Sequence, residues 1–533
     1  MPQPQQNINI AAPGFAGLNT QDSPIGMDLS FAGIADNCII DDKGRISSRG
    51  GFQAVTADPD TTGQIGDAVA ETVYEYKDSN GTAHILFSGM LEGGSTEAMW
   101  SQSLAGTATR VTGITAVGNN WDYASLSDQC FIAQEGNDVQ YTDDGLTFQA
   151  MTQQPQVVTQ PNIITSGLGH LWVASSVSNK TVVEWSVITS NLGLGGAATP
   201  WTGSGSGSID IEEYWPNGSD NITALAVHNN FLVIFGSQSI LVYTIPSTGT
   251  NVGPEFMYLS DTIENIGCVA RDSVTNIGTD LAFLDASGLR SLARTIQEKS
   301  MPIGDLSYNV RDDLVSDVTS TDGEVRCAYS QEEALFILIV PKNTGTVTYV
   351  FDTRRPLPNG QLRVTKWLGR DVTCAKRVSD GSFLIGRPGG LYKYTGGEDR
   401  SFLASEDSVT PVNFTYQTQP QDFDKPANTK MPKQVDLILL GASTYSLNVR
   451  WYFDFSREAN TKVITSTGAG GAQWGVGQWG AGVYGSTTGD IRTSRVNMWG
   501  QGKNIVLEFT GSITEQPVSI QELNVQALFG RIQ

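Results

Sequence analysis

The sequence has 533 residues, of which 55 are acidic and 33 basic, so its formal net charge is −22. Such a charge argues against a protein that grips nucleic acid through its phosphates, because that affinity comes from Lys and Arg side chains that release counterions. The chain is longer than one hydrophobic core normally supports, so we expect two or three domains. Its 58 glycines and only 17% charged residues suit short strands joined by turns, which predicts an all-β protein. No apolar run approaches the roughly 18 residues of a membrane helix.

Residues 1–60 are predicted to form an extended arm. They contain Pro13, Gly14, Pro24 and one short apolar run at 39–40. The first nine residues are rich in Pro, Gln and Asn, and they lack the basic and apolar stretches of a secretory signal. Arms of this type commonly lie on another domain or another subunit, and we expect the same here.

Residues 61–400 repeat a unit of apolar strand, polar turn and partner strand. The pairs are 83–87 with 98–100, 130–133 with 139–141, 171–174 with 182–185, 231–235 with 240–243, 280–284 with 289–292, 335–339 with 348–351, and 383–385 with 391–394. Successive units lie roughly 40 to 60 residues apart, which is the period of propeller blades. We therefore predict a β-propeller over this region. Helical periodicity is confined to 307–318, where apolar residues recur every fourth position.

Residues 401–533 have a different texture and are predicted to form a C-terminal β-rich domain. Longer runs alternate apolar and polar residues at 435–439, 447–451, 505–509 and 523–528. Period-two alternation with one apolar face is typical of a sandwich sheet. Between these strands lies a Gly/aromatic stretch that holds Trp474, Trp479 and Tyr484.

Residue types that carry catalysis or bind metals are sparse. We interpret three histidines without metal-ligand spacing as structural: His84, His170 and His228. Five widely separated cysteines are interpreted as buried free thiols: Cys38, Cys130, Cys268, Cys327 and Cys374. Adjacent carboxylates are interpreted as solvated turns, with weak calcium binding as the alternative: Asp41 with Asp42, Asp143 with Asp144, and Asp312 with Asp313. P-loops, Rossmann fingerprints and serine nucleophile elbows are absent, so the sequence predicts no catalytic residue, cofactor or metal site.

The segment YTDDGLTF at 141–148 resembles the Asp-box of sialidases and other propellers. It matches that motif at Asp143, Gly145, Thr147 and Phe148, whereas a tyrosine stands where the motif has Ser. In those propellers the box ties a turn between outer strands, and its aromatic side chain packs below. The resemblance therefore supports a propeller and implies no catalysis.

The order of features along the chain resembles that of a known family. The start runs from Ala12 to Asn19, continues at 32–37, and then reads DKGRISSRGGF over 42–52. An Asn-containing segment thus leads into a Gly-centred turn and an Arg-x-Gly. Later segments of the pattern follow at 222–236, 266–270, 280–292, 390–394 and 530–532. This order is similar to that of tail hub and nozzle proteins from short-tailed double-stranded DNA bacteriophages.

The resemblance implies a β-propeller subunit of a hexameric ring below the portal and adaptor, through which the genome leaves the virion. Its partners would be further copies of the chain, the head-to-tail adaptor ring, and tail fibres or spikes. Double-stranded DNA would pass without tight binding, in a virion tail assembled in the host cytoplasm. The family has no catalytic residues to carry across, so we expect no enzyme. The alternative is a glycan-binding or glycan-hydrolysing propeller that acts as a receptor-binding tail component.

Two segments are candidate functional sites under this resemblance. The Gly/Ser-rich stretch 192–208 is predicted to be a long loop that projects into the lumen. Its apolar side chains would close the path until ejection, and they are Leu192, Leu194 and Trp201. A disordered surface loop is the alternative. Candidates for contacts with a neighbouring subunit or partner, and for sugar stacking under the alternative function, are Trp474, Trp479 and Tyr484.

Overall fold

A computed structural model gives the fold of the chain. It describes residues 5–57, 70–90, 97–104, 106–114, 120–188, 199–248, 250, 252–278, 280–298, 305–343, 345–369, 372–395, 399–403, 406–441, 445–454, 456, 458–466, 491–513 and 517–532. Strands dominate these residues, so the predicted all-β class is confirmed. Among them no helix is long and apolar enough to span a membrane.

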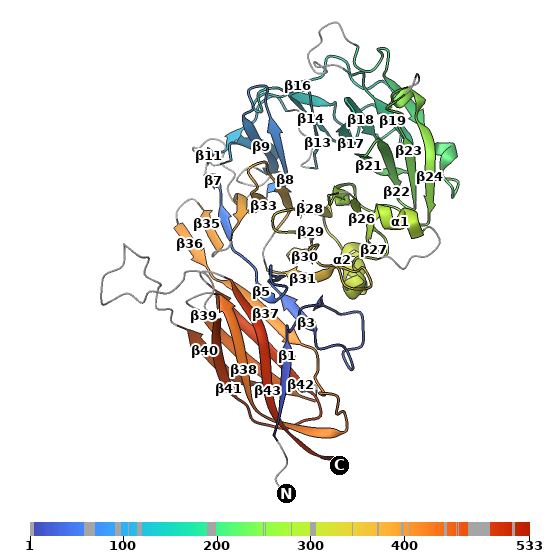
Figure 1. Cartoon of the computed structure of the whole chain (residues 1–533). Helices are drawn as coiled ribbons and strands as arrows, with labels where there is room; N and C mark the ends of the chain where they lie inside the picture. The colour runs from blue at the N-terminus through green and yellow to red at the C-terminus, as the bar shows by residue number, and fades with distance from the viewer. Residues whose placement is uncertain are drawn as a thin grey trace.

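Seven small antiparallel sheets follow one another along the described chain, and we call them together the ring (Figure 1). The first four are β8 (Ala70–Lys77), β9 (Ala83–Met90), β10 (Glu97–Gln102) and β12 (Thr109–Arg110); β13 (Asp122–Leu126), β14 (Gln129–Ala133), β15 (Gln140–Thr142) and β16 (Gln149–Ala150); β17 (Ile163–Gly167), β18 (His170–Ala174), β19 (Val182–Trp185) and β20 (Gly207–Asp210); and β21 (Ile222–His228), β22 (Phe231–Gly236), β23 (Ser239–Thr244) and β24 (Tyr258–Glu264).

The last three are β25 (Thr275–Asn276), β26 (Leu281–Asp285) and β27 (Gly288–Ser291); β28 (Arg326–Ser330), β29 (Leu335–Val340), β30 (Val347–Asp352) and β31 (Arg363–Trp367); and β32 (Cys374–Arg377), β33 (Phe383–Arg387), β34 (Gly390–Tyr394) and β6 (Phe52–Ala54). The expected apolar strand pairs therefore all lie in these sheets. The fourth strand of the seventh sheet comes from the N-terminal residues, because β6 pairs antiparallel with β34. Beyond β6 the sheet continues with β35 (Asp399–Leu403), which is parallel to β6, and β36 (Glu406–Thr410).

Neighbouring sheets of the ring enclose hydrophobic clusters in a cyclic order. Trp172 of the third sheet packs with Leu232 and Ile234 of the fourth, for example. The cycle closes because Phe87 and Trp100 of the first sheet share a cluster with Leu384 of the seventh. Strands buried on both faces are therefore continuous apolar runs, as in β29, where all six residues are buried.

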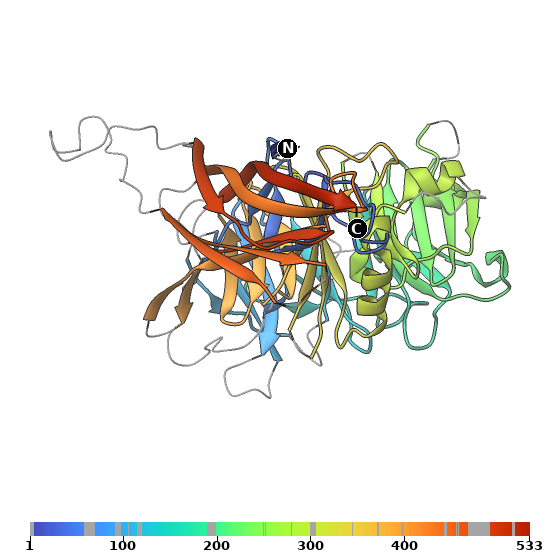
Figure 2. The same cartoon turned by 90° about the horizontal axis from the view of Figure 1, so that it is seen from below.

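The C-terminal residues form two larger sheets that pack on one shared core, and we call this part the lobe (Figure 2). One sheet has the order β4-β5-β43-β38-β41 with β1 also on β43, and the other continues the sixth ring sheet as β31-β3-β37-β42-β39-β40. The long strands are β37 (Val412–Thr418), β38 (Asn428–Gly441), β39 (Tyr445–Phe453), β40 (Asn460–Ser466), β41 (Ile491–Asn497), β42 (Ile505–Ile513) and β43 (Val518–Ile532). Burial alternates along β37 and β39, as the period-two pattern predicts.

The residues assigned above to an N-terminal arm form short strands that join the ring and the lobe. They include β1 (Gln5–Ala11), β3 (Phe31–Asp36), β4 (Cys38–Ile40) and β5 (Ile46–Ser48). Both β1 and β5 pair with β43 of the lobe. In addition, β3 lies between β37 of the lobe and β31 of the ring. The segment therefore lies on both parts of the molecule, and the N and C termini meet in one sheet (Figure 1).

Two short helices lie beside the ring. The predicted helix is confirmed as α2 (Arg311–Thr319), preceded by a 3-10 turn at Tyr308–Val310, and Leu314 is its buried residue. The sequence did not predict α1 (Leu292–Glu298), which begins directly after β27. Its seven residues are too few to show a periodic apolar stripe.

Candidate functional site

The first strands of the ring sheets bring charged side chains to a common centre. Contacts run from β13 to β17, β17 to β21, β25 to β28, β28 to β32 and β32 to β8, so these strands surround one space. We call the charged residues gathered there the hub: Asp122, Arg271, Asp272, Arg326 and Lys376. Each belongs to one of these strands or to the 3-10 turn Arg271–Ser273 before β25.

Arg271 fastens three segments of the hub. Its Nε donates to Asp272 Oδ1 at 2.7 Å, and its Nη1 donates to the carbonyl and side-chain oxygens of Asn162 at 2.8 and 2.9 Å. Its Nη2 donates to Asn120 Oδ1 at 2.7 Å. Burial lowers the pKa of Arg271, but the carboxylates of Asp272 and Asp122 raise it by more, so this side chain stays charged. A planar guanidinium with five donors suits such a multidentate position.

The two hub carboxylates have opposite pKa shifts. Burial raises the pKa of Asp122 to about 6, although Arg271 pulls it down. Burial also raises the pKa of Asp272, but there the pairing with Arg271 and then Arg326 outweighs it and leaves the pKa below its usual value. The difference follows from contacts: Asp272 Oδ2 lies 3.3 Å from Arg326 Nε. Asp122 instead accepts backbone N–H groups from Ile164 and Tyr123.

A cavity of about 180 Å³ lies between the hub and the aromatic residues of β8 and β13. Tyr74 and Tyr123 stack there with ring centroids 5.2 Å apart. Lys376 Nζ stands over the Tyr74 ring at 5.2 Å from its centroid. Burial lowers the pKa of Lys376 even though Asp122 and Glu75 lie nearby. The arrangement presents a cation and an aromatic face to a small cavity that is open to solvent, which suits a compact anionic ligand.

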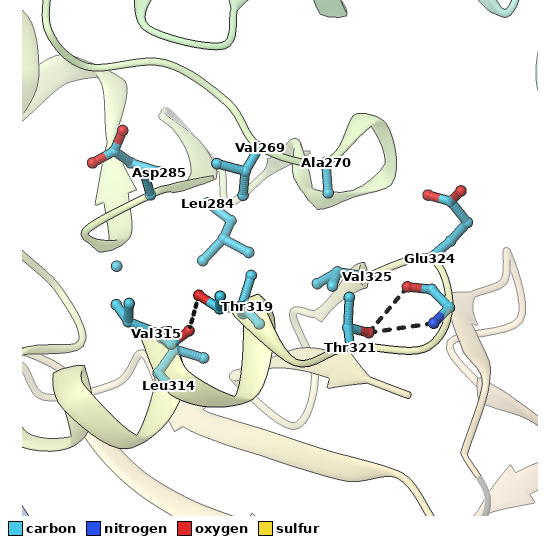
Figure 3. A pocket seen from close by; sticks show the side chains of 14 residues that line it. Val269, Ala270, Leu284, Asp285, Leu314, Val315, Thr319, Thr321, Glu324 and Val325 are labelled. Atoms are coloured by element: carbon cyan, nitrogen blue, oxygen red, sulfur yellow. Dashed lines mark hydrogen bonds between the residues drawn. The ribbon is translucent and has the colours of Figure 1, made fainter. Parts of the chain in front are cut away.

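A second pocket, of about 310 Å³, adjoins the hub and is mainly apolar. Figure 3 shows Val269 and Leu284 facing Leu314 and Val315 of α2, with Asp285 at one end and Glu324 at the other. The residues before Arg271 and before Arg326 line this pocket, whereas Asp272 and Arg326 themselves line the polar cavity. The same two segments therefore separate an apolar pocket from a charged one.

The sequence-based gate candidates are only partly within the described residues. Leu192 and Leu194 lie outside them, whereas Trp201 is 4% exposed and packs with Val158 and Val187. The Trp201 side chain is therefore part of the hydrophobic core between sheets of its own chain. It is not exposed for contact with a symmetry mate. The predicted loop also ends earlier than expected, because Gly207 and Ser208 pair with Trp185 and Glu184 as the start of β20. A gating role for this segment stays a prediction.

The other candidates can be placed as follows. The aromatic residues Trp474, Trp479 and Tyr484 lie outside the described residues. His170 is buried beside the Ser186 carbonyl, and burial lowers its pKa. His84 lies 3.4 Å from Asp78, and His228 contacts Asn229 at the end of β21. All five cysteines are free thiols, and Cys327 is half-buried while the other four are buried. Within the described ranges no cluster of His, Cys, Asp and Glu has a metal-binding arrangement.

The Asp-box-like turn is tied by different residues than the motif alignment predicts. The N–H groups of Leu146 and Thr147 both donate to Asp144 Oδ1 at 2.7 Å, and Thr142 Oγ1 donates to the same oxygen. Gly145 N–H donates to Thr142 Oγ1 at 2.9 Å. The turn therefore uses Asp144 and Thr142, each one position later than the alignment places the motif. Phe148 is buried below it, as the resemblance implies.

Sequence reasoning missed the hub. Its residues have no common position in the repeat units: Asp122 and Arg326 begin β13 and β28, Lys376 is the third residue of β32, and the other two lie in the 3-10 turn Arg271–Ser273. Of the first strands of the ring sheets only β13 and β28 begin with a charged residue, so no repeated position in the sequence signalled the hub.

No protein-family model matches the chain, and no curated protein matches it significantly. Similar solved structures include the extracellular domain of a hybrid two-component system of B. thetaiotaomicron, with a TM-score of 0.41, 11% identity, and coverage of 87% of this chain and 61% of that one. The same domain described within a one-component system gives a TM-score of 0.37, 11% identity, and coverage of 81% and 57%. PorZ, a surface component of the type-IX secretion system of Porphyromonas gingivalis, gives 0.34, 10%, and coverage of 67% and 39%. The chain thus spans about three fifths of the first two, and scores this low assign no function.

Proposed function

We propose that this chain is a structural subunit of a ring-shaped tail nozzle or hub of a short-tailed bacteriophage, a conduit for genome ejection and not an enzyme. We infer that its seven small sheets form a β-propeller whose last blade is closed by β6. The propeller is supported by the cyclic order of shared clusters and by the pairing of an N-terminal strand with β34. A blade completed from the other end of the chain fastens a ring that would otherwise open between its first and last sheets.

The observation that carries the proposal is that residues of the family-like pattern at 42–52 join the ring to the lobe. Gly44 has a φ of +75°, and a Cβ there would meet the Phe15 ring at 2.9 Å. A Cβ on Gly50 would lie 2.0 Å from the Thr395 carbonyl oxygen. Arg49 is 2% exposed and stands over the Phe52 ring at 4.4 Å. These positions therefore have strict steric requirements, which suits a rigid joint between the ring and the lobe.

The charged residues that we call the hub favour a DNA channel formed between copies of the chain over a channel through the centre of one chain. Arg271 bridges Asn120, Asn162 and Asp272 across the centre of the ring, so side chains fill the path at this level. Six copies with a charge of −22 each, or −132 together, would give a predominantly repulsive field toward DNA. DNA would then slide along the wall of the assembled tube, because attractive walls hold a duplex by counterion release.

Electron microscopy of the purified chain and of virions tests this proposal. We expect a sixfold ring with an axial opening, formed by the chain alone or once the adaptor ring is added. A stable trimer or pentamer at this position in the tail would contradict it. A monomer that binds oligosaccharide would instead favour the receptor-binding alternative. Tight, salt-sensitive duplex binding by an assembled ring would contradict the proposed repulsive lumen.

A further inference from the structure

The hub cavity contains a lysine whose ammonium group has no anionic partner at contact distance among the described residues. Lys376 lies in β32, and its Nζ makes no hydrogen bond or ion pair with the described residues. Its contact is the face of Tyr74, at 5.2 Å from the ring centroid. Lys376 keeps access to solvent, yet atoms of the surrounding sheets crowd it enough to lower its pKa. A cation held in this way gains from any anion that enters the cavity.

The carboxylates of the hub are already committed to other groups. Both oxygens of Asp272 pair with guanidinium groups, Oδ1 with Arg271 Nε at 2.7 Å and Oδ2 with Arg326 Nε at 3.3 Å. The oxygens of Asp122 accept N–H groups of the backbone, each from a different strand. Nearby Glu75 binds the backbone and hydroxyl of Ser379. Glu75 keeps its negative charge in these bonds, so three cations face three carboxylates, and among the described residues Lys376 is the cation without a carboxylate at contact distance.

Arg326 adds a second donor on the same cavity. Its Nη2 donates to Asn120 Oδ1 at 3.2 Å and its Nε faces Asp272, while its Nη1 makes no hydrogen bond among the described residues. The remaining lining includes Val73, Trp121 and Ala375, which are apolar. The cavity therefore combines two cationic groups with an apolar and aromatic wall.

We propose that the hub cavity binds a small monoanionic carboxylate with an apolar body, paired with Lys376 and Arg326 and covered by the Tyr74 ring. The single cation without a carboxylate at contact distance among the described residues, Lys376, matches a monoanion. Phosphate, which carries more negative charge near neutral pH, would meet Asp122 and Asp272 at the cavity wall. The volume of about 180 Å³ suits a ligand of the size of benzoate. The site belongs to one chain, so it does not depend on the nozzle proposal.

Calorimetric titration with sodium benzoate, acetate and phosphate tests the site. We expect saturable benzoate binding, weaker acetate binding, and no saturable phosphate binding. Lys376→Met should weaken benzoate binding at least tenfold, whereas Lys376→Arg should retain most of it. The matched control is Lys77→Met, at the exposed end of β8, which should bind as the parent chain does.

A second measurement locates the ligand. Cys327 lines the cavity and is half-buried, whereas the other four cysteines are buried. Saturating benzoate should slow alkylation of Cys327 at least threefold, as mapped by mass spectrometry, in the parent chain and Lys77→Met but not in Lys376→Met. The proposal is overturned if benzoate does not saturate the parent chain, if Lys376→Met binds as tightly, if Cys327 is not protected, or if phosphate binds more tightly than benzoate.

Discussion

The ring and the lobe bury their strands in different ways. Ring strand β14 is buried at all five positions, because sheets pack on both of its faces. Lobe strand β37 alternates, with one face in the core and the other toward solvent. The clusters differ as well: Trp172 packs in a cluster confined to two ring sheets, whereas Trp451 packs in one that covers both lobe sheets and reaches the fifth and sixth ring sheets. The ring is thus stabilised one interface at a time, and the lobe through a single large core.

Replacing each of these two tryptophans by alanine tests this difference between the ring and the lobe and should have the largest effect on stability. Both are 0% exposed and donate an indole hydrogen bond to a backbone oxygen, at 3.1 Å for Trp172 and 3.0 Å for Trp451. Trp172→Ala and Trp451→Ala should each cost about 5 kcal/mol, at the upper end for such a truncation. Hydrogen exchange should distinguish them. Trp172→Ala should expose amides of the third and fourth ring sheets, whereas Trp451→Ala should expose the lobe and β28–β31 together.

If amide hydrogen exchange rose equally along the whole chain in both variants, the ring sheets would not have separate interfaces. The partly exposed Trp499, which packs edge-on against Trp451 at 4.8 Å between ring centroids, provides the matched control. Trp499→Ala removes an aromatic contact but little buried area. Its amide exchange should therefore stay close to that of the parent chain.

The hub gives the next largest effect, because it couples the ring sheets where the hydrophobic clusters do not meet. Arg271→Met should lower the free energy of unfolding by about 4 kcal/mol, since it leaves oxygens of Asn120, Asn162 and Asp272 without their donor. Thermal denaturation should show the loss, and Arg271→Lys should recover only part of it because an ammonium group cannot reproduce the fork. Arg377→Met removes an exposed pair with Glu332 and should change little.

The same contrast explains what could be predicted from the sequence. Apolar runs such as 231–235 and 335–339 located the ring strands, because burial on both faces leaves no polar position in them. Alternation of apolar and polar residues located the lobe strands, because only one face of these strands is buried in the core. Neither pattern contains the long-range pairings of β1 with β43 or β6 with β34, since these depend on which edges meet in space.

The hub was missed for a related physical reason. Its strands carry polar side chains on the face that surrounds the cavity, so they are not apolar runs; β32, for example, reads Cys-Ala-Lys-Arg. The network also depends on turn residues, such as Asn120 and Asp272, that come from sheets far apart in the sequence. Local patterns predict a strand, but they do not specify which charges will converge.

Titration of Asp122 should sharpen the distinction between a polar hub and apolar interfaces. Burial raises its pKa from 3.8 to about 6, so the folded chain holds this proton more tightly than the unfolded chain does. Stability from this group is therefore present below about pH 4 and is lost as the pH rises to about 6. A shift of roughly two units corresponds to at most about 3 kcal/mol. The Asp122→Asn variant should lack this loss. The stability of the parent chain relative to that of the variant should therefore decrease between pH 4 and pH 6.

Urea denaturation at pH 4 and pH 7 checks the sign. Asp272, whose pKa is lowered, contributes in the opposite direction, and comparing Asp122→Asn with the parent chain cancels that contribution. If the parent chain gained stability relative to the variant between pH 4 and pH 6, the assignment of a raised pKa to Asp122 would be wrong.

The smallest expected effect concerns the turn between β15 and β16, which is tied by hydrogen bonds to the exposed carboxylate of Asp144. Asp144 Oδ1 accepts three hydrogen bonds, from the N–H groups of Leu146 and Thr147 and from the Thr142 hydroxyl. Asp144→Ala should therefore cost about 1 to 2 kcal/mol, the range for losing hydrogen bonds to a charged acceptor in a solvated turn. Asp143→Ala is the matched control and should change the melting temperature little. If Asp143→Ala lowered stability more than Asp144→Ala, Asp143 would be the residue that ties the turn, as the motif alignment predicts. Because the second ring sheet has separate interfaces with its neighbours, amide exchange in Asp144→Ala should rise in β15 and β16 but not in the lobe.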